Sequence, residues 1–139
     1  MEIQNLLLKG DDLKMKNFLG RHVLAEIYDC NVDILNDINS VEKIMVSAAL
    51  EAGAEIREVV FHKFSPQGVS GVVVISESHL AVHTWPELGY AAVDVFTCGD
   101  KVNPWDACQY VSDNFEAGSV SAKEYKRGMT EVVRNAANM

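Results

Sequence analysis

The segment Gly68–Gly99, GVSGVVVISESHLAVHTWPELGYAAVDVFTCG, carries the strongest structural signal, because it is typical of three short strands joined by turns. Its first run, GVVVI, is apolar at consecutive positions, as in a strand that is buried on both sides. Pro86 and Gly89 separate the second run from the third, and Pro66 breaks the chain upstream. The strands predicted here cover residues 55–64, 68–76, 79–85 and 90–98. Because short turns join mostly antiparallel strands, we expect an antiparallel sheet.

Two further strands are predicted outside this segment. Apolar and polar residues roughly alternate over residues 20–30 and again in the run SVSAKEYK at 119–126, as half-buried strands require. Residues 1–17 are expected to be a variable lead-in. Residues 128–139 are expected to be a fraying tail or a short helix.

Two helices are predicted between the strands. The first covers residues 39–53, where Asn39 can cap with Glu42 three residues later and a glycine ends the helix. The second covers residues 103–115, with Asn103 as the cap and a proline at the tolerated first position. The apolar face of the first helix consists of Val41, Ile44, Met45 and Ala48.

These elements predict an α+β fold: a two-layer sandwich in which two main helices cover one face of a mainly antiparallel sheet. The other sheet face would remain exposed in a single chain, although GVVVI is apolar at consecutive positions. We therefore expect a dimer formed sheet to sheet, with four layers in the order αββα. A monomer whose tail covers that face is the alternative.

Length and composition indicate one globular domain over residues 1–139, with 48% hydrophobic and 23% charged residues. The formal net charge of −8 argues against a nucleic-acid partner, because phosphate binding needs a basic patch. No apolar run is long enough to cross a membrane, and the first residues do not resemble a signal peptide. A cytoplasmic location is therefore expected.

Several reactive side chains lie within about twenty residues of each other on the predicted strands. Ser78 follows Glu77 at a strand break, His79 and His83 are four residues apart, and Cys98 ends the last strand. Strand residues four apart are separated by about 13 Å, so a zinc site that joins both histidines to the cysteine is disfavoured. The three cysteines show no paired spacing and suggest neither a disulfide framework nor a zinc cage.

The run FSPQGVSGVVVISESHLAVHTWPELGYAAVDVFTCG, together with GRHVLAE at the first strand, resembles the short, pyruvoyl-dependent S-adenosylmethionine decarboxylases of prokaryotes. The resemblance extends from about residue 20 to residue 115. It implies that Ser78 Oγ attacks the carbonyl of Glu77 and that the chain then breaks between them. Residues 1–77 would form the β subunit and residues 78–139 the α subunit.

The same resemblance gives each reactive residue a role. Ser78 becomes the pyruvoyl cofactor, which forms a Schiff base with the substrate amine. His83 is the proton acceptor in processing, and Cys98 is the proton donor in catalysis. Glu77 supplies the cleaved carbonyl, and Ser70 assists processing. No metal is implied.

Two further positions match residues that hold the substrate in this family. Phe64 matches an aromatic ring that stacks on adenine, and Glu87 matches an acid that binds the ribose hydroxyls. The turn and core roles that such residues usually play remain open for both. Trp85 is expected to be a core residue at the edge of the site. The resemblance also implies that Ser78 and Cys98 of one chain face Phe64, Ser70, His83 and Glu87 of its dimer mate.

The expected function is decarboxylation of S-adenosylmethionine to S-adenosylmethioninamine and CO2 for spermidine biosynthesis, after autocatalytic cleavage of a zymogen. Two alternatives remain at this point. One is a pyruvoyl-dependent arginine decarboxylase with the same processing motif. The other is a dimeric nucleoside-binding relative that never cleaves.

Overall fold

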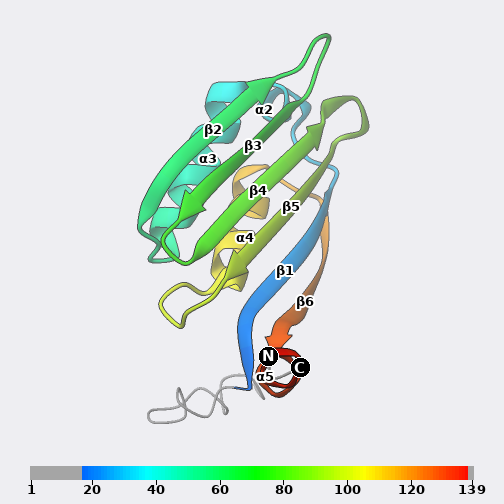
Figure 1. Cartoon of the computed structure of the whole chain (residues 1–139). Coiled ribbons are helices and arrows are strands. Elements are labelled where there is room, and N and C mark those ends of the chain that lie inside the picture. The colour runs from blue at the N-terminus through cyan, green and yellow to red at the C-terminus, as the bar shows by residue number, and fades with distance from the viewer. Residues whose placement is uncertain (1–16, 138–139) are drawn as a thin grey trace.

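The computed structural model describes residues 17–137, in which a six-stranded antiparallel sheet carries helices on one face (Figure 1). The strands are β1 (Phe18–Tyr28), β2 (Ile56–Lys63), β3 (Val69–Ile75), β4 (Ser78–Trp85), β5 (Tyr90–Thr97) and β6 (Ser119–Met129). Their order is β2-β3-β4-β5-β1-β6. The predicted α+β sandwich is confirmed, whereas the predicted lead-in lies almost entirely outside the described residues.

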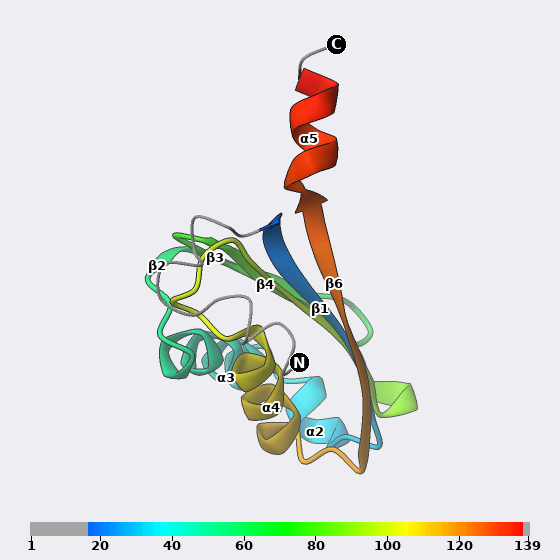
Figure 2. The ribbon, with the colours of Figure 1, turned by 90° about the horizontal axis from the view of Figure 1, so that it is seen from below.

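The helical elements are α2 (Val32–Leu35), α3 (Ile38–Glu51), the short 3-10 helix η2 (Pro86–Leu88), α4 (Pro104–Asn114) and α5 (Thr130–Ala137). Figure 2 shows α3 and α4 side by side against the sheet. The expected second helix is confirmed: Asn103 caps it by accepting a hydrogen bond from the Trp105 backbone at 2.9 Å. Pro104 occupies the first helical position, where no N–H is needed.

The first predicted helix begins one residue earlier than the sequence indicated, and its cap is different. Asp37, not Asn39, is the N-cap, and its carboxylate accepts the Ser40 backbone N–H at 3.1 Å. Asn39 therefore lies inside the first turn. The sequence reading also missed α2, a single turn that Asn31 caps through a hydrogen bond from the Ile34 backbone.

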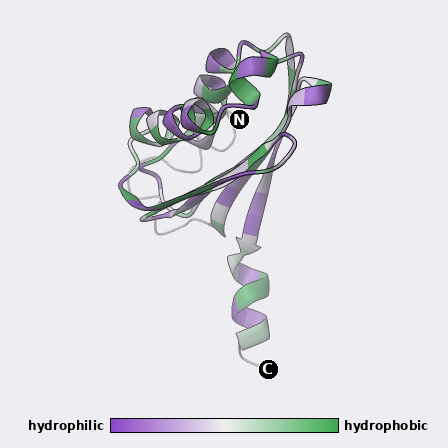
Figure 3. Cartoon of the chain, turned by 90° about the horizontal axis from the view of Figure 1, so that it is seen from above, coloured by the Kyte–Doolittle hydropathy of each residue, from purple (hydrophilic) through white to green (hydrophobic). Residues whose placement is uncertain are grey.

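The hydrophobic core lies between the sheet and the helices. Along β4, Leu80, Val82 and Thr84 are buried under the helices, and the residues between them point to the other face. Figure 3, which views the chain from above, shows the helices and the sheet as two layers with apolar segments on both. Gly71 on β3 is required by close packing, because the Phe61 ring on β2 occupies the space that a Cβ would fill.

An ion pair ties the last strand to the core. Glu124 on β6 accepts two hydrogen bonds from Arg21, at 2.9 and 3.1 Å, and one from Trp105 Nε1 at 2.6 Å. Burial alone would raise the pKa of the Glu124 carboxyl, but these hydrogen bonds and the Arg21 charge lower it below its usual value. This carboxylate therefore joins β1, β6 and α4.

The outer sheet face is less uniformly apolar than predicted. Leu24, Val60 and Val74 are exposed on it, but two histidines, His79 and His83, point outward as well. Val74 is 36% exposed in the single chain, so the run GVVVI is not buried on both sides there. The helix α5 projects beyond the end of β6 and contains no buried residue (Figure 2). Within the described residues, the tail therefore does not cover this face.

No helix in the described part of the chain is both long enough and apolar enough to span a membrane.

Candidate active site

A two-residue turn, Ser76-Glu77, joins β3 to β4 and places Ser78 at the start of β4. Ser78 has a φ of 149°, which residues with a side chain rarely adopt. Such a conformation costs of order 1–3 kcal/mol and persists only where the surrounding structure enforces it. Here the pairing of Ser78 with Ile75 on β3 and with Thr97 on β5 holds the backbone in place.

The carbonyl that precedes Ser78 is held by a hydrogen bond. The Cys98 backbone N–H donates to the Glu77 oxygen at 2.9 Å. An N–H aimed at a carbonyl oxygen polarises the C=O bond and stabilises an oxyanion that forms there. The Glu77 side chain packs over Gly99, where a Cβ would collide with its carboxylate. In the TCG sequence at the end of β5, the Cys98 N–H therefore hydrogen-bonds to the turn, and Gly99 leaves space for the Glu77 side chain.

Cys98 differs from the other two cysteines of the chain. It is exposed, whereas Cys30 and Cys108 are buried. Burial, with a smaller contribution from Asp29, raises the pKa of Cys30 to about 11, and burial with Asp94 raises that of Cys108 to about 12. Both buried thiols therefore remain protonated and inert at neutral pH. Among the described residues, Cys98 is therefore the one exposed thiol.

A second group of predicted residues gathers at the opposite end of β4. A cavity of about 300 Å³ is lined by Phe64, Ser70, His83, Trp85 and Glu87, among others. Ser70 Oγ lies 2.8 Å from His83 Nδ1, and the two residues are direct partners across β3 and β4. Trp85 is not the core residue that the sequence suggested, because it is 40% exposed and forms part of the cavity wall.

Contacts from the helix layer fix the base of this cavity. The Thr84 hydroxyl donates to the Leu35 carbonyl at 2.8 Å and accepts the Val69 N–H at 2.9 Å. Asn36 accepts the Gly68 N–H at 3.0 Å through its side-chain oxygen. The short helix α2, which the sequence reading missed, therefore anchors the loop beside Phe64.

The turn that carries Ser78 and the cavity that contains His83 are not brought together within one chain. Ser78 and His83 are five residues apart on one extended strand, which corresponds to about 17 Å at the usual rise of about 3.4 Å per residue. Ser78, Glu77 and Cys98 lie near one end of the strand. The cavity with Ser70 and His83 lies near the other end.

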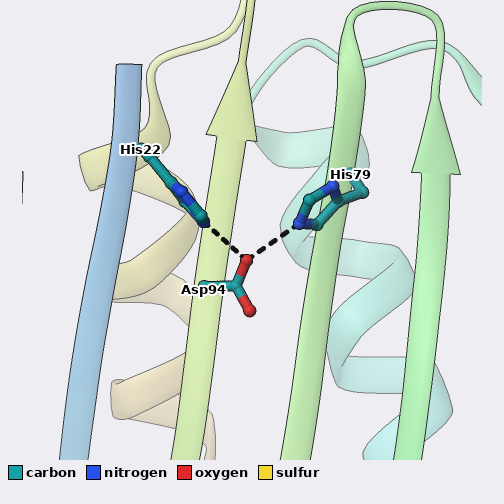
Figure 4. Close-up of side chains that lie close together, drawn as sticks. All are labelled: His22, His79 and Asp94. Atoms are coloured by element: carbon teal, nitrogen blue, oxygen red, sulfur yellow. Dashed lines mark hydrogen bonds and ion pairs between the residues drawn. The ribbon is translucent and has the colours of Figure 1, made fainter. Parts of the chain in front are cut away.

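A cluster that the sequence reading missed lies on the outer face, close to the turn. One carboxylate oxygen, Asp94 Oδ2, lies 2.8 Å from His22 Nε2 and 2.8 Å from His79 Nε2 (Figure 4). These side chains come from the adjacent strands β1, β5 and β4. The feature of the sequence that could have pointed to this cluster is that all three residues lie at outward positions of otherwise apolar strands. Nothing in the sequence indicated that β1 lies beside β5.

The other nitrogens of both rings in this cluster also have neighbours. Arg127 Nη1 donates to His22 Nδ1 at 2.8 Å, so the proton of the His22 ring is on Nε2 and faces Asp94. His79 Nδ1 lies 3.5 Å from Ser78 Oγ. The cluster therefore extends from Arg127 to the Ser78 hydroxyl.

The fold and this geometry define an α+β sandwich in which Ser78 follows a hydrogen-bonded carbonyl at a strained turn. The family model for S-adenosylmethionine decarboxylase matches residues 21–128. The chain belongs to the S-adenosylmethionine decarboxylase family. This match extends past residue 115, where the resemblance noted in the sequence ends, and includes most of β6.

Individual relatives are similar over most of their length. The S-adenosylmethionine decarboxylase proenzyme of Syntrophomonas wolfei is 77% identical over 113 residues, which cover 81% of this chain and 90% of that protein. The proenzyme of Pelotomaculum thermopropionicum is 79% identical over 111 residues, which cover 80% and 88%. The crystal structure of the adenosylmethionine decarboxylase of Aquifex aeolicus superposes with a TM-score of 0.78 at 30% identity, covering 83% of this chain and 95% of that one.

Proposed function

We propose that the chain cleaves itself between Glu77 and Ser78 and then decarboxylates S-adenosylmethionine to S-adenosylmethioninamine and CO2. Residues 1–77 become one subunit and residues 78–139 the other. The family and the word proenzyme in the names of its relatives support this proposal. The observation that carries it is the hydrogen bond from the Cys98 N–H to the Glu77 carbonyl, next to a serine with a φ of 149°.

Cleavage follows from what these atoms can do. The Cys98 N–H draws electron density toward the Glu77 oxygen, which makes the carbonyl carbon a better target for a hydroxyl. Backbone strain at Ser78 is relieved when the peptide bond is exchanged for an ester. His83 then accepts the Cα proton of the ester, and the chain breaks by elimination. The dehydroalanine left at position 78 tautomerises to an imine, which water hydrolyses with release of ammonia. The new chain therefore begins with a pyruvoyl group made from Ser78.

A pyruvoyl group supplies a carbonyl that takes up the substrate amine and accepts the electrons released when CO2 leaves. The residues around position 78 fit that task, because the turn lies at the sheet end beside an exposed thiol. Cys98 returns a proton to the former α-carbon of the substrate. Its side chain is exposed and so free to reach the substrate.

The substrate is held by the residues of the cavity. Phe64 is 47% exposed, so its ring is free to stack on the adenine base. Glu87 lies on η2 at the rim, where its carboxylate can accept two hydrogen bonds from ribose hydroxyls. Ser70 keeps the His83 ring in position through their 2.8 Å contact.

A separation of about 17 Å between Ser78 and His83 is too long for one site within one chain. We infer a two-fold dimer formed sheet to sheet, in which Ser78 and Cys98 of one chain face the cavity of its partner. The outer face suits this role, because it carries exposed apolar side chains as well as the cavity and no helix covers it within residues 17–137. The dimer has two equivalent sites and four layers in the order αββα.

Release of CO2 from S-adenosylmethionine and from arginine, measured on the same cleaved protein, tests this function. The proposal predicts turnover of S-adenosylmethionine alone. Turnover of arginine alone would instead identify an arginine decarboxylase that keeps the processing motif. Binding of nucleosides by a chain that stays intact would identify a non-cleaving relative.

A further inference from the structure

We propose that His79, oriented by Asp94, is the general base that removes the proton of the Ser78 hydroxyl in the first step of self-cleavage. This inference rests on the proposed function, because it concerns how that cleavage begins. It gives His79 a role separate from that of His83, which lies about 17 Å from Ser78 in the same chain.

The proton positions in the cluster follow from its hydrogen bonds. Arg127 donates to His22 Nδ1, so His22 must use its Nε2–H to donate to Asp94 Oδ2. The same oxygen lies 2.8 Å from His79 Nε2, and a carboxylate can only accept, so His79 Nε2 carries a proton as well. In neutral His79 this leaves a lone pair on Nδ1, the nitrogen that lies 3.5 Å from Ser78 Oγ.

Ser78, His79 and Asp94 therefore have the arrangement of nucleophile, base and orienting carboxylate. A contact of 3.5 Å is long for a strong hydrogen bond, and catalytic contacts of this kind commonly shorten as the reaction proceeds. Asp94 stabilises the positive charge that His79 gains. His22 and Arg127 are positioning residues, because they contact the carboxylate and each other but not the serine.

The proposed step balances without an outside reactant. The Ser78 Oγ–H proton passes to His79 Nδ1 while Oγ bonds to the Glu77 carbonyl carbon. The electron pair of that carbonyl moves onto its oxygen, and the Cys98 N–H donates a hydrogen bond to the oxyanion that forms. When the tetrahedral intermediate collapses, the Glu77–Ser78 C–N bond breaks, and the Ser78 nitrogen takes the proton back from His79. An ester and a neutral His79 remain.

The same three side chains could also hold a metal ion. Two features favour the proton-transfer role. Both nitrogen–oxygen separations are 2.8 Å, the usual distance when a proton lies between the atoms. Arg127 also places a positive charge against the His22 ring, which disfavours a cation beside it.

Cell-free synthesis followed by intact-mass measurement tests the inference on the full chain, with and without hydroxylamine, which splits esters but not peptide bonds. His79→Ala should be cleaved at least about 100-fold more slowly than wild type, the lower bound for loss of a positioned base. Its uncut chain should resist hydroxylamine, because the ester never forms. His83→Ala should accumulate a chain that hydroxylamine splits at position 78. Added imidazole should restore cleavage to His79→Ala, which a purely structural role would not allow.

Asp94→Asn keeps the shape of the side chain and serves as a second variant. Its amide can donate to His79 Nε2 and so move the ring proton to Nδ1, and cleavage should slow about tenfold or more. His62→Ala, a substitution of an exposed histidine on β2, should cleave at the wild-type rate.

The outcomes separate this inference from the proposed function. Wild type that never splits would overturn both. Wild type that splits while His79→Ala splits as fast, or while His79→Ala accumulates the ester, would overturn only the role of His79. An uncut His79→Ala that imidazole does not rescue, combined with wild-type cleavage by Asp94→Asn, would also overturn it. Cleavage that stops with a chelator and resumes with zinc would also overturn the role of His79.

Discussion

Mixed dimers of two inactive variants test whether the site is built from two chains. Ser78→Ala removes the nucleophile and leaves His83 in place, whereas His83→Ala removes the base and leaves Ser78 in place. Each variant alone should remain uncut. When the two chains share a dimer, one site combines both substitutions, and the other combines an intact Ser78 with an intact His83. That second site should cleave.

The size of the effect follows from the separation of about 17 Å along β4 and from the two-fold symmetry. If the His83 that acts on Ser78 always comes from the partner chain, only mixed dimers contain an intact site. With equal amounts of the two chains and random pairing, about half of the His83→Ala chains lie in mixed dimers. In the unpurified mixture, about half of all His83→Ala chains should therefore be cleaved, and in purified mixed dimers all of them should be. None of the Ser78→Ala chains should be cleaved in either sample.

The assay is co-expression of the two variants with different affinity tags, followed by intact mass of the doubly purified dimers. A matched control carries both substitutions on one chain and pairs it with wild type. In that dimer neither site is complete, so the wild-type chain should stay uncut. Cleavage of that wild-type chain, or doubly tagged dimers of the two single variants with no cleavage, would refute the two-chain site.

Three smaller predictions concern stability and reactivity. Glu124→Gln should lower the free energy of unfolding by about 2 kcal/mol, because a charged hydrogen-bonded pair with Arg21 is lost. The folded pKa of Glu124 lies below its usual value, so this contribution is present above the usual pKa and is lost as the pH falls through the folded pKa. The stabilities of wild type and variant, measured by chemical denaturation, should therefore converge in acid. Gly71→Ala should destabilise by about 1–3 kcal/mol in the same assay, because a Cβ collides with the Phe61 ring; an unchanged midpoint would contradict that packing. Iodoacetamide at neutral pH should alkylate Cys98 first, and mass mapping that finds either buried cysteine labelled earlier would argue against its role.

The strands and the helix α4 could be predicted from sequence because their signals are local. A period of two residues and an Asn-Pro start require no knowledge of distant residues. The start of α3 was wrong for an equally local reason. Asp37 and Asn39 are both good cap residues, and the Ser40 N–H goes to the Asp37 carboxylate. The single turn α2 was too short to leave a periodic signal.

Only part of the candidate site could be predicted from the sequence. Periodicity correctly placed His79 and His83 four residues apart on one strand face, and this spacing disfavoured a zinc site shared with Cys98. The roles of individual residues came from family resemblance and remain predictions. The His22–Asp94–His79 cluster could not be foreseen, because it depends on β1 pairing with β5 across a long sequence separation, whereas the pairing of the consecutive strands β4 and β5 was expected.

Intact mass of the purified full-length chain under denaturing conditions tests the central claim most directly. The account predicts two fragments, residues 1–77 and 78–139, the second beginning with a pyruvoyl group and therefore blocked to Edman sequencing. Ser78→Ala, prepared in the same way, should give one mass. A wild-type chain that remains a single full-length species over days would contradict the account.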